Sequence, residues 1–378
     1  MRVATGLAIG NEVNPSLAAQ AVMQAMQAAD ISIASSVLLF LTSEFARDPA
    51  PALRAAAKAA SCTQVMGCSA PGIFTEQDWI LDAPAAAAMV FSGGVSLQAS
   101  ADGGPEQMLL ALAAPNAINT TWMSTTGVRF GGVSGDAIGQ GPFSVWQNGK
   151  GTVKGHCEAA LVGVNGAVSA AHGLRMLSEP QSITEVEGHD LRQLAGKPAL
   201  RMLHYAYLQN TTSTEESLPL HRLMAVFADS AEAIDGGDYQ LATLVSGNEY
   251  DNSVTIAKHL KLGQWLCWAI RETEAAQADL LQTAIRLNDQ LAAKPAFGLL
   301  FSCLGRGPYF YGGVDRDLSL LRQQFPYMPL IGFYGNGEIA PTNGTSELLP
   351  YSAVLGLFSQ KVSPQQSTLT AITQDELV

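Results

Sequence analysis

The feature that most constrains the fold is a pattern that occurs twice, once in each half of the chain. The first copy reads SVLLFLTSEFARDP and then TQVMGCSAPGIF, and the second reads AFGLLFSCLGRGPY and then MPLIGFYGNGEI. In each copy an apolar run predicts a buried strand, a helix follows, and a second strand leads into two glycines five residues apart. The repeat predicts an internal duplication; the alternative is a chance likeness between two ordinary units of this kind.

The periodicity of the remaining sequence predicts a mixed fold. Strands are expected at 1–10, 36–42, 62–68, 262–270, 296–302 and 329–334, and helices at 15–29, 49–60, 272–292 and 318–324. Asn14 is placed to cap the first helix, with Pro15 at its first position. Within a strand-rich stretch over 127–178, Asn148-Gly149 is typical of a two-residue hairpin turn. The fold class is therefore α/β with α+β elements: two related α/β domains with mixed sheets flanked by helices, related by the duplication.

A polar segment near the middle of the chain predicts the domain boundary. The segment 209–218 has no apolar periodicity, as expected of a linker. We expect one domain over 1–209, a second over 218–363 and a polar tail over 364–378. A length of 378 residues suits two or three domains.

The charge balance and the cysteine count restrict the partners and the compartment. The formal net charge is −12, which disfavours both a nucleic-acid backbone and an anionic membrane surface. The longest apolar runs are far shorter than a membrane-spanning helix. The five cysteines are odd in number and contain no C-x-x-C pair, so neither a disulfide framework nor a structural zinc site is expected. Free thiols, and polar residues too early for a signal peptide, favour the cytoplasm.

Three glycine-rich segments follow expected strands, at 67–72, 131–136 and 332–338. Glycine allows a positive φ or a close approach to a bound group, and ligands of α/β sheets bind beyond the carboxyl ends of strands. The functional interpretation is a small-molecule pocket, and the structural one is tight turns packed against neighbouring strands. No standard nucleotide-binding motif is present.

Charged residues near these segments suggest how a ligand would be held. Arg306 follows a buried strand and is suited to clamp a carboxylate; alternatively it pairs with a structural carboxylate such as Glu338. Asp136 and Glu338 could fix an ammonium or hydroxyl group, or instead cap backbone N–H groups.

Catalysis has little support in the sequence. Cys68 or Cys303 could act as a nucleophile, but a reactive thiolate needs a base or a positive neighbour, and a buried, inert thiol is the simpler interpretation. The six histidines show no metal-ligand spacing. We therefore expect a protein that is not an enzyme and has no metal site.

GCSAPGIF, RFGGVSGD and FSCLGRG…PLIGFYGNGEIAP…LLPYSAVLGLF together resemble the FIST proteins, with their N-terminal and C-terminal FIST domains. The resemblance covers about residues 30–360. It implies a small-ligand sensory module in signal transduction, with amino acids or related small carboxylates as ligands. The chain carries no recognisable output domain, so the resemblance also implies a separate partner, such as a histidine kinase or a cyclic-dinucleotide enzyme. A homodimer is compatible with the composition.

The resemblance and the residue chemistry together give one set of expected ligand-binding residues: Gly67, Cys68, Ser69, Gly72, Gly131, Gly132, Asp136, Ser302, Cys303, Arg306, Tyr334, Gly337 and Glu338. Ala70-Pro71 departs from the family pattern, and Pro71 stiffens the first segment. Two alternatives remain open. One is a haem-binding nitric-oxide sensor, with His172 as the axial ligand. The other is a cysteine-dependent enzyme acting on a small substrate.

Overall fold

The computed structural model describes residues 1–99, 104, 107–152, 155–211, 217–237, 239–291, 293–342 and 345–361. The chain forms two compact units: unit 1 contains 1–171 and 281–378, and unit 2 contains 172–280. Unit 2 is therefore an insertion in the sequence of unit 1. This division by compactness differs from the domains expected at 1–209 and 218–363, which stay a sequence prediction. The expected tail over 364–378 lies outside the described residues.

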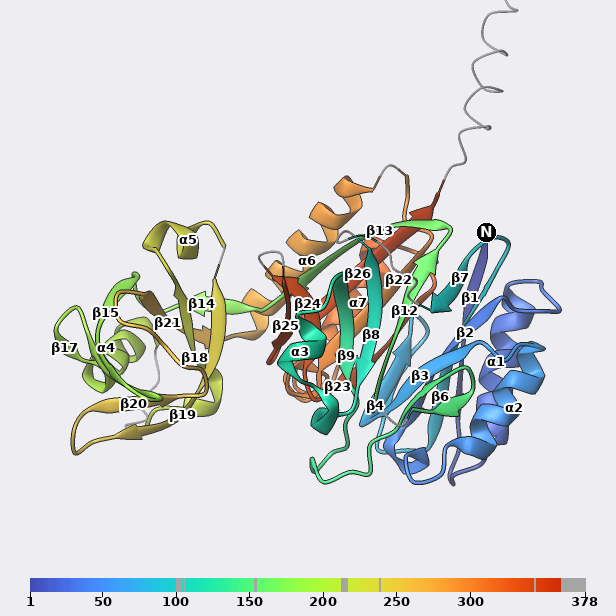
Figure 1. Ribbon diagram of the computed structural model, residues 1–378, viewed down its shortest axis with the longest axis horizontal. Helices are drawn as coiled ribbons and strands as arrows, with labels where there is room; N and C mark the ends of the chain where they lie inside the picture. The colour runs from blue at the N-terminus through green and yellow to red at the C-terminus, as the bar shows by residue number, and fades with distance from the viewer. Residues whose placement is uncertain are drawn as a thin grey trace, which may run out of the picture. The chain divides into compact units, whose positions relative to one another are not determined.

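The first sheet of unit 1 has the strand order β1-β6-β2-β3-β10-β11, and Figure 1 labels its strands β1, β2, β3 and β6. Its strands are β1 (Arg2–Ile9), β2 (Ser36–Thr42), β3 (Val65–Ala70), β6 (Ala85–Ser92), β10 (Val145–Gln147) and β11 (Lys150–Gly151). β2 and β3 are parallel, and the other neighbours are antiparallel. Helices α1 (Ser16–Ala28) and α2 (Ala50–Ala60) cover one face. Their buried faces are rich in alanine, which lets the helices approach the sheet closely.

The second sheet of unit 1 has the order β13-β26-β22-β23-β4-β5. Its strands are β4 (Gly72–Thr75), β5 (Trp79–Leu81), β13 (Val164–Ala171), β22 (Phe297–Cys303), β23 (Leu330–Gly335) and β26 (Ala353–Gln360). Helix α6 (Thr273–Gln290) precedes β22, and α7 (Arg316–Gln324) joins β22 to the parallel β23. The order β13-β26-β22-β23 repeats the order β1-β6-β2-β3 of the first sheet. The two sequence copies thus share a topology, while the duplication as its origin stays a prediction.

The third sheet of unit 1 has the order β25-β24-β9-β8-β12-β7, with β8 and β9 parallel. Its strands are β7 (Ser96–Ala99), β8 (Met108–Ala113), β9 (Val128–Val133), β12 (His156–Val162), β24 (Glu338–Thr342) and β25 (Thr345–Leu349); the short helix α3 (Thr120–Met123) lies between β8 and β9 in sequence. A buried apolar cluster joins residues of all three sheets. At its centre Phe40 of β2 meets Phe301 of β22 edge-to-face, with ring centroids 6.4 Å apart. Each phenylalanine follows the leucine whose carbonyl faces a glycine of the parallel neighbour: Leu39 faces Gly67, and Leu300 faces Gly332.

Unit 2 is an antiparallel barrel. Its strands are β14 (Leu174–Met176), β15 (Gln181–Glu187), β16 (Asp190–Leu194), β17 (Lys197–Pro198), β18 (Leu223–Ala228), β19 (Gln240–Asn248), β20 (Ser253–Ile256) and β21 (Trp265–Arg271). The order β21-β15-β16-β20-β19-β18 closes on itself because β18 also pairs with β21. Helices α4 (Ala199–Asn210) and α5 (Ala231–Asp235) belong to the same unit, and α4 adds Leu200 and Leu203 to the barrel core.

The predicted α/β class is confirmed, and the expected helices and strands agree with the structure to within three residues at most ends. The hairpin is also confirmed: β10 pairs with β11 across Asn148 (φ 53°) and Gly149 (φ 67°). The first helix, α1, begins at Ser16 with Pro15 as its N-cap residue, one position later than expected. Asn14 Oδ1 accepts the N–H of Ser16 at 2.9 Å. The local signals in these segments therefore agree with the tertiary structure.

Candidate functional site

Most of the predicted glycine turns are strands, which corrects the expectation for them. Gly67, Cys68 and Ser69 lie in β3, Gly72 begins β4, and Gly131 and Gly132 lie in β9. The reason is that most of these glycines lie where two parallel strands pack closely against each other. A Cβ on Gly67 would lie 1.7 Å from Leu39 O, one on Gly131 1.9 Å from Ala111 O, and one on Gly332 1.8 Å from Leu300 O. Each parallel pair in unit 1 thus contains a glycine where the neighbouring backbone leaves no room for a side chain.

The three segments nevertheless come together, first through serine hydroxyls. Ser134 Oγ donates to the carbonyl of Ser69 at 2.6 Å, and the two hydroxyl oxygens are 3.1 Å apart. The N–H of Ser144 donates to Ser69 Oγ at 3.0 Å. Ser134 and Ser144 were not expected at the site. Ser134 lies within the second glycine-rich segment, so its place in the sequence already pointed to the site.

The third segment joins the second through backbone hydrogen bonds. The N–H of Asn336 donates to Val133 O at 3.0 Å, and the N–H of Val133 donates to Gly337 O at 2.9 Å. Gly337 has a φ of +139°, which favours glycine. The exposed Asn336 side chain lies beside Gly135. We call the segments 69–72, 134–136 and 335–338 the loop cluster.

Asp136 takes the structural role that the sequence left open. Its Oδ2 accepts the N–H of Gly141 at 2.8 Å, and its Oδ1 accepts the N–H of Gly139. Both carboxylate oxygens therefore hold the following loop. Asp136 is not the acidic group of this cluster best placed to meet a ligand.

Arg306 forms a buried ion pair, although with a carboxylate that sequence reasoning did not name. Its Nε donates to Asp317 Oδ2 at 2.8 Å and its Nη2 lies 3.4 Å from Asp317 Oδ1. Its Nη1 donates to Ala171 O at 2.9 Å. The turn Leu304–Arg306 after β22 and the start of α7 bring the two side chains together.

Two tyrosines and a second aspartate extend this buried network. The hydroxyl of Tyr311 donates to Asp317 Oδ1 at 2.6 Å, and the hydroxyl of Tyr334 donates to Asp315 Oδ2. Asp315 also caps α7 by accepting the N–H of Leu318 at 2.8 Å. Burial and the nearby charge of Asp317 raise the pKa of Asp315 to about 6. Tyr334 was expected at the site; Tyr311, Asp315 and Asp317 were missed.

Glu338, at the start of β24, is completely buried. Its Oε2 accepts the N–H of Ser352 at 3.3 Å. Its Oε1 has no hydrogen-bond partner among the described residues. Burial raises the pKa of Glu338 well above its ordinary value, while the charge of Arg306 acts in the opposite direction. A buried carboxyl oxygen without a partner costs about 1–3 kcal/mol or more, so this group is an unusual one to find in a core.

The two cysteines considered as nucleophiles are both buried. Burial, with the neighbouring Cys157, raises the pKa of the Cys68 thiol well above its usual range. Such a thiol is poorly ionised at neutral pH and therefore a weak nucleophile. Cys303 ends β22, and its N–H donates to Ser352 O at 3.0 Å. Ser302 is buried in the same strand beside Tyr334 of β23.

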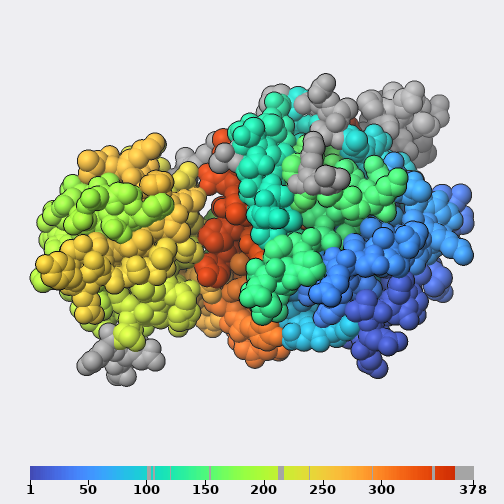
Figure 2. Space-filling view, turned by 60° about the horizontal axis from the view of Figure 1, so that its bottom comes forward, coloured from blue at the N-terminus to red at the C-terminus, as the bar shows by residue number. Residues whose placement is uncertain are grey.

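The segment after β22 also contacts the chain near residue 80. Figure 2 shows this orange segment beside the light-blue one, where the hydroxyl of Tyr309 donates to Asp82 Oδ2 at 2.6 Å. Gly307 lies against the ring of Tyr334, where a Cβ would be 2.9 Å from Cδ1. Segment 304–315 therefore packs over the buried network.

His172 lies in unit 2, in polar surroundings. Its backbone N–H donates to Asp279 Oδ2 at 2.6 Å, and its ring centroid lies 6.1 Å from that of Tyr239. Burial and the charge of Asp279 raise the pKa of Tyr239 to about 12. A haem needs wide apolar walls beside its axial ligand. A carboxylate and a phenol do not fit that requirement.

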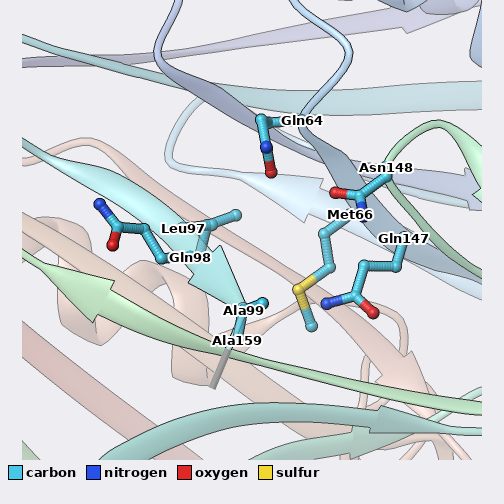
Figure 3. Close-up of a pocket in the computed structure, with 8 residues that line it drawn as sticks. All are labelled: Gln64, Met66, Leu97, Gln98, Ala99, Gln147, Asn148 and Ala159. Carbon is cyan, nitrogen blue, oxygen red and sulfur yellow. The ribbon is translucent and has the colours of Figure 1, made fainter. Parts of the chain in front are cut away.

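A small surface pocket lies elsewhere in unit 1 and contains none of the predicted site residues. It encloses about 210 Å³ of space that includes open solvent. Figure 3 shows its lining, in which four side-chain amides surround Met66: Gln64, Gln98, Gln147 and Asn148, with Leu97, Ala99 and Ala159. In the part of the chain that the structure describes, no group of three or more His, Cys, Asp or Glu residues is placed to hold a metal ion. No described helix is both long enough and apolar enough to cross a membrane.

Comparison with known families identifies the chain. The FIST N domain matches residues 35–197, and the FIST C domain matches residues 199–341. The chain belongs to the FIST family. FIST domains are associated with sensing in signal transduction rather than with catalysis. The two domain matches meet at residue 198, which lies inside unit 2.

This FIST protein has curated relatives in bacteria and in animals. It is 27% identical over 242 residues to an uncharacterised protein of Mycobacterium tuberculosis, covering 64% of this chain and 63% of the relative. It is 29% identical over 200 residues to an uncharacterised protein of Mycobacterium bovis, covering 52% of each. It is also 28% identical over 183 residues to human F-box only protein 22, covering 43% of this chain and 42% of the relative. The chain thus spans less than two thirds of the length of these relatives.

Proposed function

We propose that this FIST protein is a cytoplasmic sensory protein that binds a small polar ligand, an amino acid or a related small carboxylate, at the loop cluster of unit 1. One observation carries the proposal: three segments far apart in the sequence meet, and one of them ends at Glu338, a buried carboxyl with an oxygen that has no hydrogen-bond partner among the described residues. Buried polar groups in folded proteins are normally paired, so an unpaired one calls for an explanation, and a ligand that pairs with it is the one proposed.

The proposed mechanism of sensing is stabilisation of one arrangement of the loop cluster. The segments are held to one another by few side-chain hydrogen bonds, those of Ser69 and Ser134 among them. A ligand that bridges them favours the arrangement in which they lie together. We propose that a separate signalling protein, such as a histidine kinase or a cyclic-dinucleotide enzyme, reads this change.

The states of Cys68 and Asp136 favour binding over catalysis. The raised pKa of Cys68 leaves little thiolate, and both oxygens of Asp136 are engaged by backbone N–H groups. The polar neighbours of His172 do not support the haem alternative. A binding role therefore needs neither a reactive cysteine nor a haem pocket, which the two alternatives require.

The first test is native mass spectrometry of the freshly purified protein against its denatured mass. A mass difference in the range of a small metabolite supports the proposal, whereas the mass of haem contradicts it. A thermal-shift screen of amino acids and carboxylates follows, because a ligand at 100 times its Kd stabilises the native state by about 2.7 kcal/mol.

Two variants test where the ligand binds. Asn336→Ala changes an exposed side chain in the loop cluster, and we expect it to reduce the ligand-induced shift with little change in basal Tm. Gln98→Ala is the matched control, since Gln98 is an exposed amide that lines the pocket of Figure 3. If only Gln98→Ala loses the ligand-induced Tm shift, the ligand binds in that pocket and the proposal is contradicted.

A further inference from the structure

Arg306 is already engaged within the protein and is not available to a ligand carboxylate. The carboxylate of Asp317 contacts two nitrogens of Arg306, Nε at 2.8 Å and Nη2 at 3.4 Å. The third nitrogen, Nη1, donates to Ala171 O at 2.9 Å. Both side chains of the ion pair are 2% exposed. An internal carboxylate therefore already stands where the carboxylate of a ligand would bind.

The buried network instead has an excess of acidic groups. Arg306 is its buried cation, and Asp315, Asp317 and Glu338 are its buried carboxyls. Asp317 is matched by Arg306, and Asp315 accepts hydrogen bonds from Tyr334 and from the N–H of Leu318. The neighbouring Arg316 is partly exposed and stacks over the ring of Tyr311, 5.9 Å from its centroid. Glu338 is also acted on by the charge of Arg306, but the ion pair of that arginine is with Asp317. Three buried carboxyls therefore share one buried guanidinium.

The unpartnered atom defines the group that would complete the site. Oε1 of Glu338 is an acceptor when the carboxyl is ionised, and Oε2 keeps the N–H of Ser352. An ammonium group supplies both the missing donor and the missing positive charge, and charge-assisted hydrogen bonds of this kind are about twice as strong as neutral ones. We infer that the ligand is a primary amine and that Glu338 binds its ammonium group.

This inference rests on the proposed function and names the ligand class of the same site: the amine is required and a carboxylate is not. Glu338 is fully buried, so the ligand reaches it only when the chain around 335–338 and 350–352 moves apart. Gly335 and Gly337 flank Asn336, and the positive φ of Gly337 is a backbone conformation that glycine adopts readily. The exposed amide of Asn336 is available to the polar remainder of the ligand.

Binding of an amine has a proton balance that other ligands lack. Burial holds a proton on Glu338 at a pH where an ordinary glutamate is already ionised. When the ammonium group arrives, the carboxyl gives this proton to solvent and becomes the carboxylate that faces the cation. No covalent bond forms or breaks, and up to one proton is released for each ligand bound.

The experiment compares matched ligands on the wild-type full chain. The probes are the proteinogenic amino acids, the carboxylic acids that lack their amino groups and the amines that lack their carboxyl groups. Tm shifts are measured first, and the ligands that shift the Tm are titrated calorimetrically at pH 6 in two buffers of different ionisation enthalpy. We expect shifts from the amino acids or the amines, none from the deaminated acids, and a net release of protons on binding.

Glu338→Gln and Glu44→Gln form the variant pair. The glutamine at 338 keeps an oxygen for the N–H of Ser352 but loses the charge, so we expect at least tenfold weaker amine binding and no proton release. Glu44→Gln makes the same exchange at an exposed side chain of unit 1 outside the loop cluster, so its binding is expected to stay within about twofold of wild type.

The outcomes separate the two proposals. If deaminated acids bind as well as their amino acids, or if Glu338→Gln binds amines like wild type, the amine assignment is wrong while the sensory function stands. If no probe shifts the wild-type protein, both are contradicted. Because the ligand comparison and the proton count use the wild-type chain, a failure of Glu338→Gln to fold does not affect them.

Discussion

Arg306 and Asp317 form a two-contact ion pair inside unit 1, with Nε 2.8 Å from Oδ2 and Nη2 3.4 Å from Oδ1. Tyr311 donates a further hydrogen bond to the same carboxylate. The pair is enclosed on all sides, so each charge depends on the other for its solvation. Arg306 therefore stabilises the fold, and its guanidinium does not bind the carboxylate of a ligand.

Removal of Arg306 is expected to destabilise the protein strongly. Arg306→Ala leaves Asp317 buried without its cation, which costs about 3–5 kcal/mol. Urea unfolding measures the loss. Arg192→Ala is the control, because Arg192 pairs with the exposed Glu187 and such surface pairs contribute about 0–1 kcal/mol. Equal losses in the two variants would contradict the structural role of Arg306.

Asp315 is expected to make stability depend on pH between about 4 and 6. Its folded-state pKa of about 6 is raised above the unfolded value, so the native state holds more protons in this range. Stability linked to Asp315 is present below pH 4 and is lost as the pH rises through 6. The shift corresponds to about 3 kcal/mol.

Asp315→Asn isolates this effect. The amide keeps an oxygen for the N–H of Leu318 but does not ionise. Urea unfolding of both proteins from pH 4 to pH 7 should show wild type losing about 3 kcal/mol relative to the variant. Glu338 is present in both proteins, so its own titration cancels in the difference. Two parallel pH profiles would show that Asp315 has an ordinary pKa.

Gly67 is expected to tolerate no side chain, because of packing rather than ligand approach. A Cβ there would lie 1.7 Å from Leu39 O and 2.7 Å from Nε1 of Trp146. Gly67→Ala should therefore cost about 3 kcal/mol or more. Gly151→Ala, in β11 with open space around its Cβ, should stay within about 1 kcal/mol of wild type. Chemical denaturation of the two variants gives the comparison, and a mild effect of Gly67→Ala would disprove the packing role.

The thiols are expected to differ sharply in reactivity. Cys62 is partly exposed, whereas the other four cysteines are buried, and burial raises the pKa of Cys267 to about 12. Ellman's reagent at pH 8 should modify Cys62 at least about 100-fold faster than the rest. Cys62→Ser should remove the fast phase. Peptide mapping that finds Cys68 or Cys303 labelled first would revive the cysteine-dependent enzyme.

The local elements of the fold were readable from the sequence, whereas its long-range pairings were not. Apolar runs such as 36–42 lie buried on both faces of a sheet and are long enough to be recognised. Nothing local shows that β13 pairs with β26, or that the strands of unit 2 close into a barrel. Those pairings depend on contacts between segments that are far apart in the chain.

The glycine-rich segments predict where the candidate site lies, but they predict the role of most of their glycines wrongly. The glycine-rich segments do converge, but most of their glycines serve strand packing. The sequence leaves open whether Arg306 clamps a ligand or pairs with a structural carboxylate, because its partner on α7, Asp317, is placed by tertiary structure. Asp315 did carry a signal, since an aspartate before an amphipathic run is a helix cap; the helix was expected at Leu318, two residues after its start at Arg316.

The discontinuity of unit 1 has a consequence for synthesis on the ribosome. Val164 of β13 pairs with Gln360 of β26, and β4 pairs with β23. At about 5–20 residues per second, β13 leaves the ribosome roughly 10–40 s before its partner exists. During that interval the nascent chain carries unpaired strand edges, which are templates for aggregation. Unit 2, whose strands all lie within 172–280, is the part that can close first, so this protein is expected to depend on chaperones until its last strand has been made.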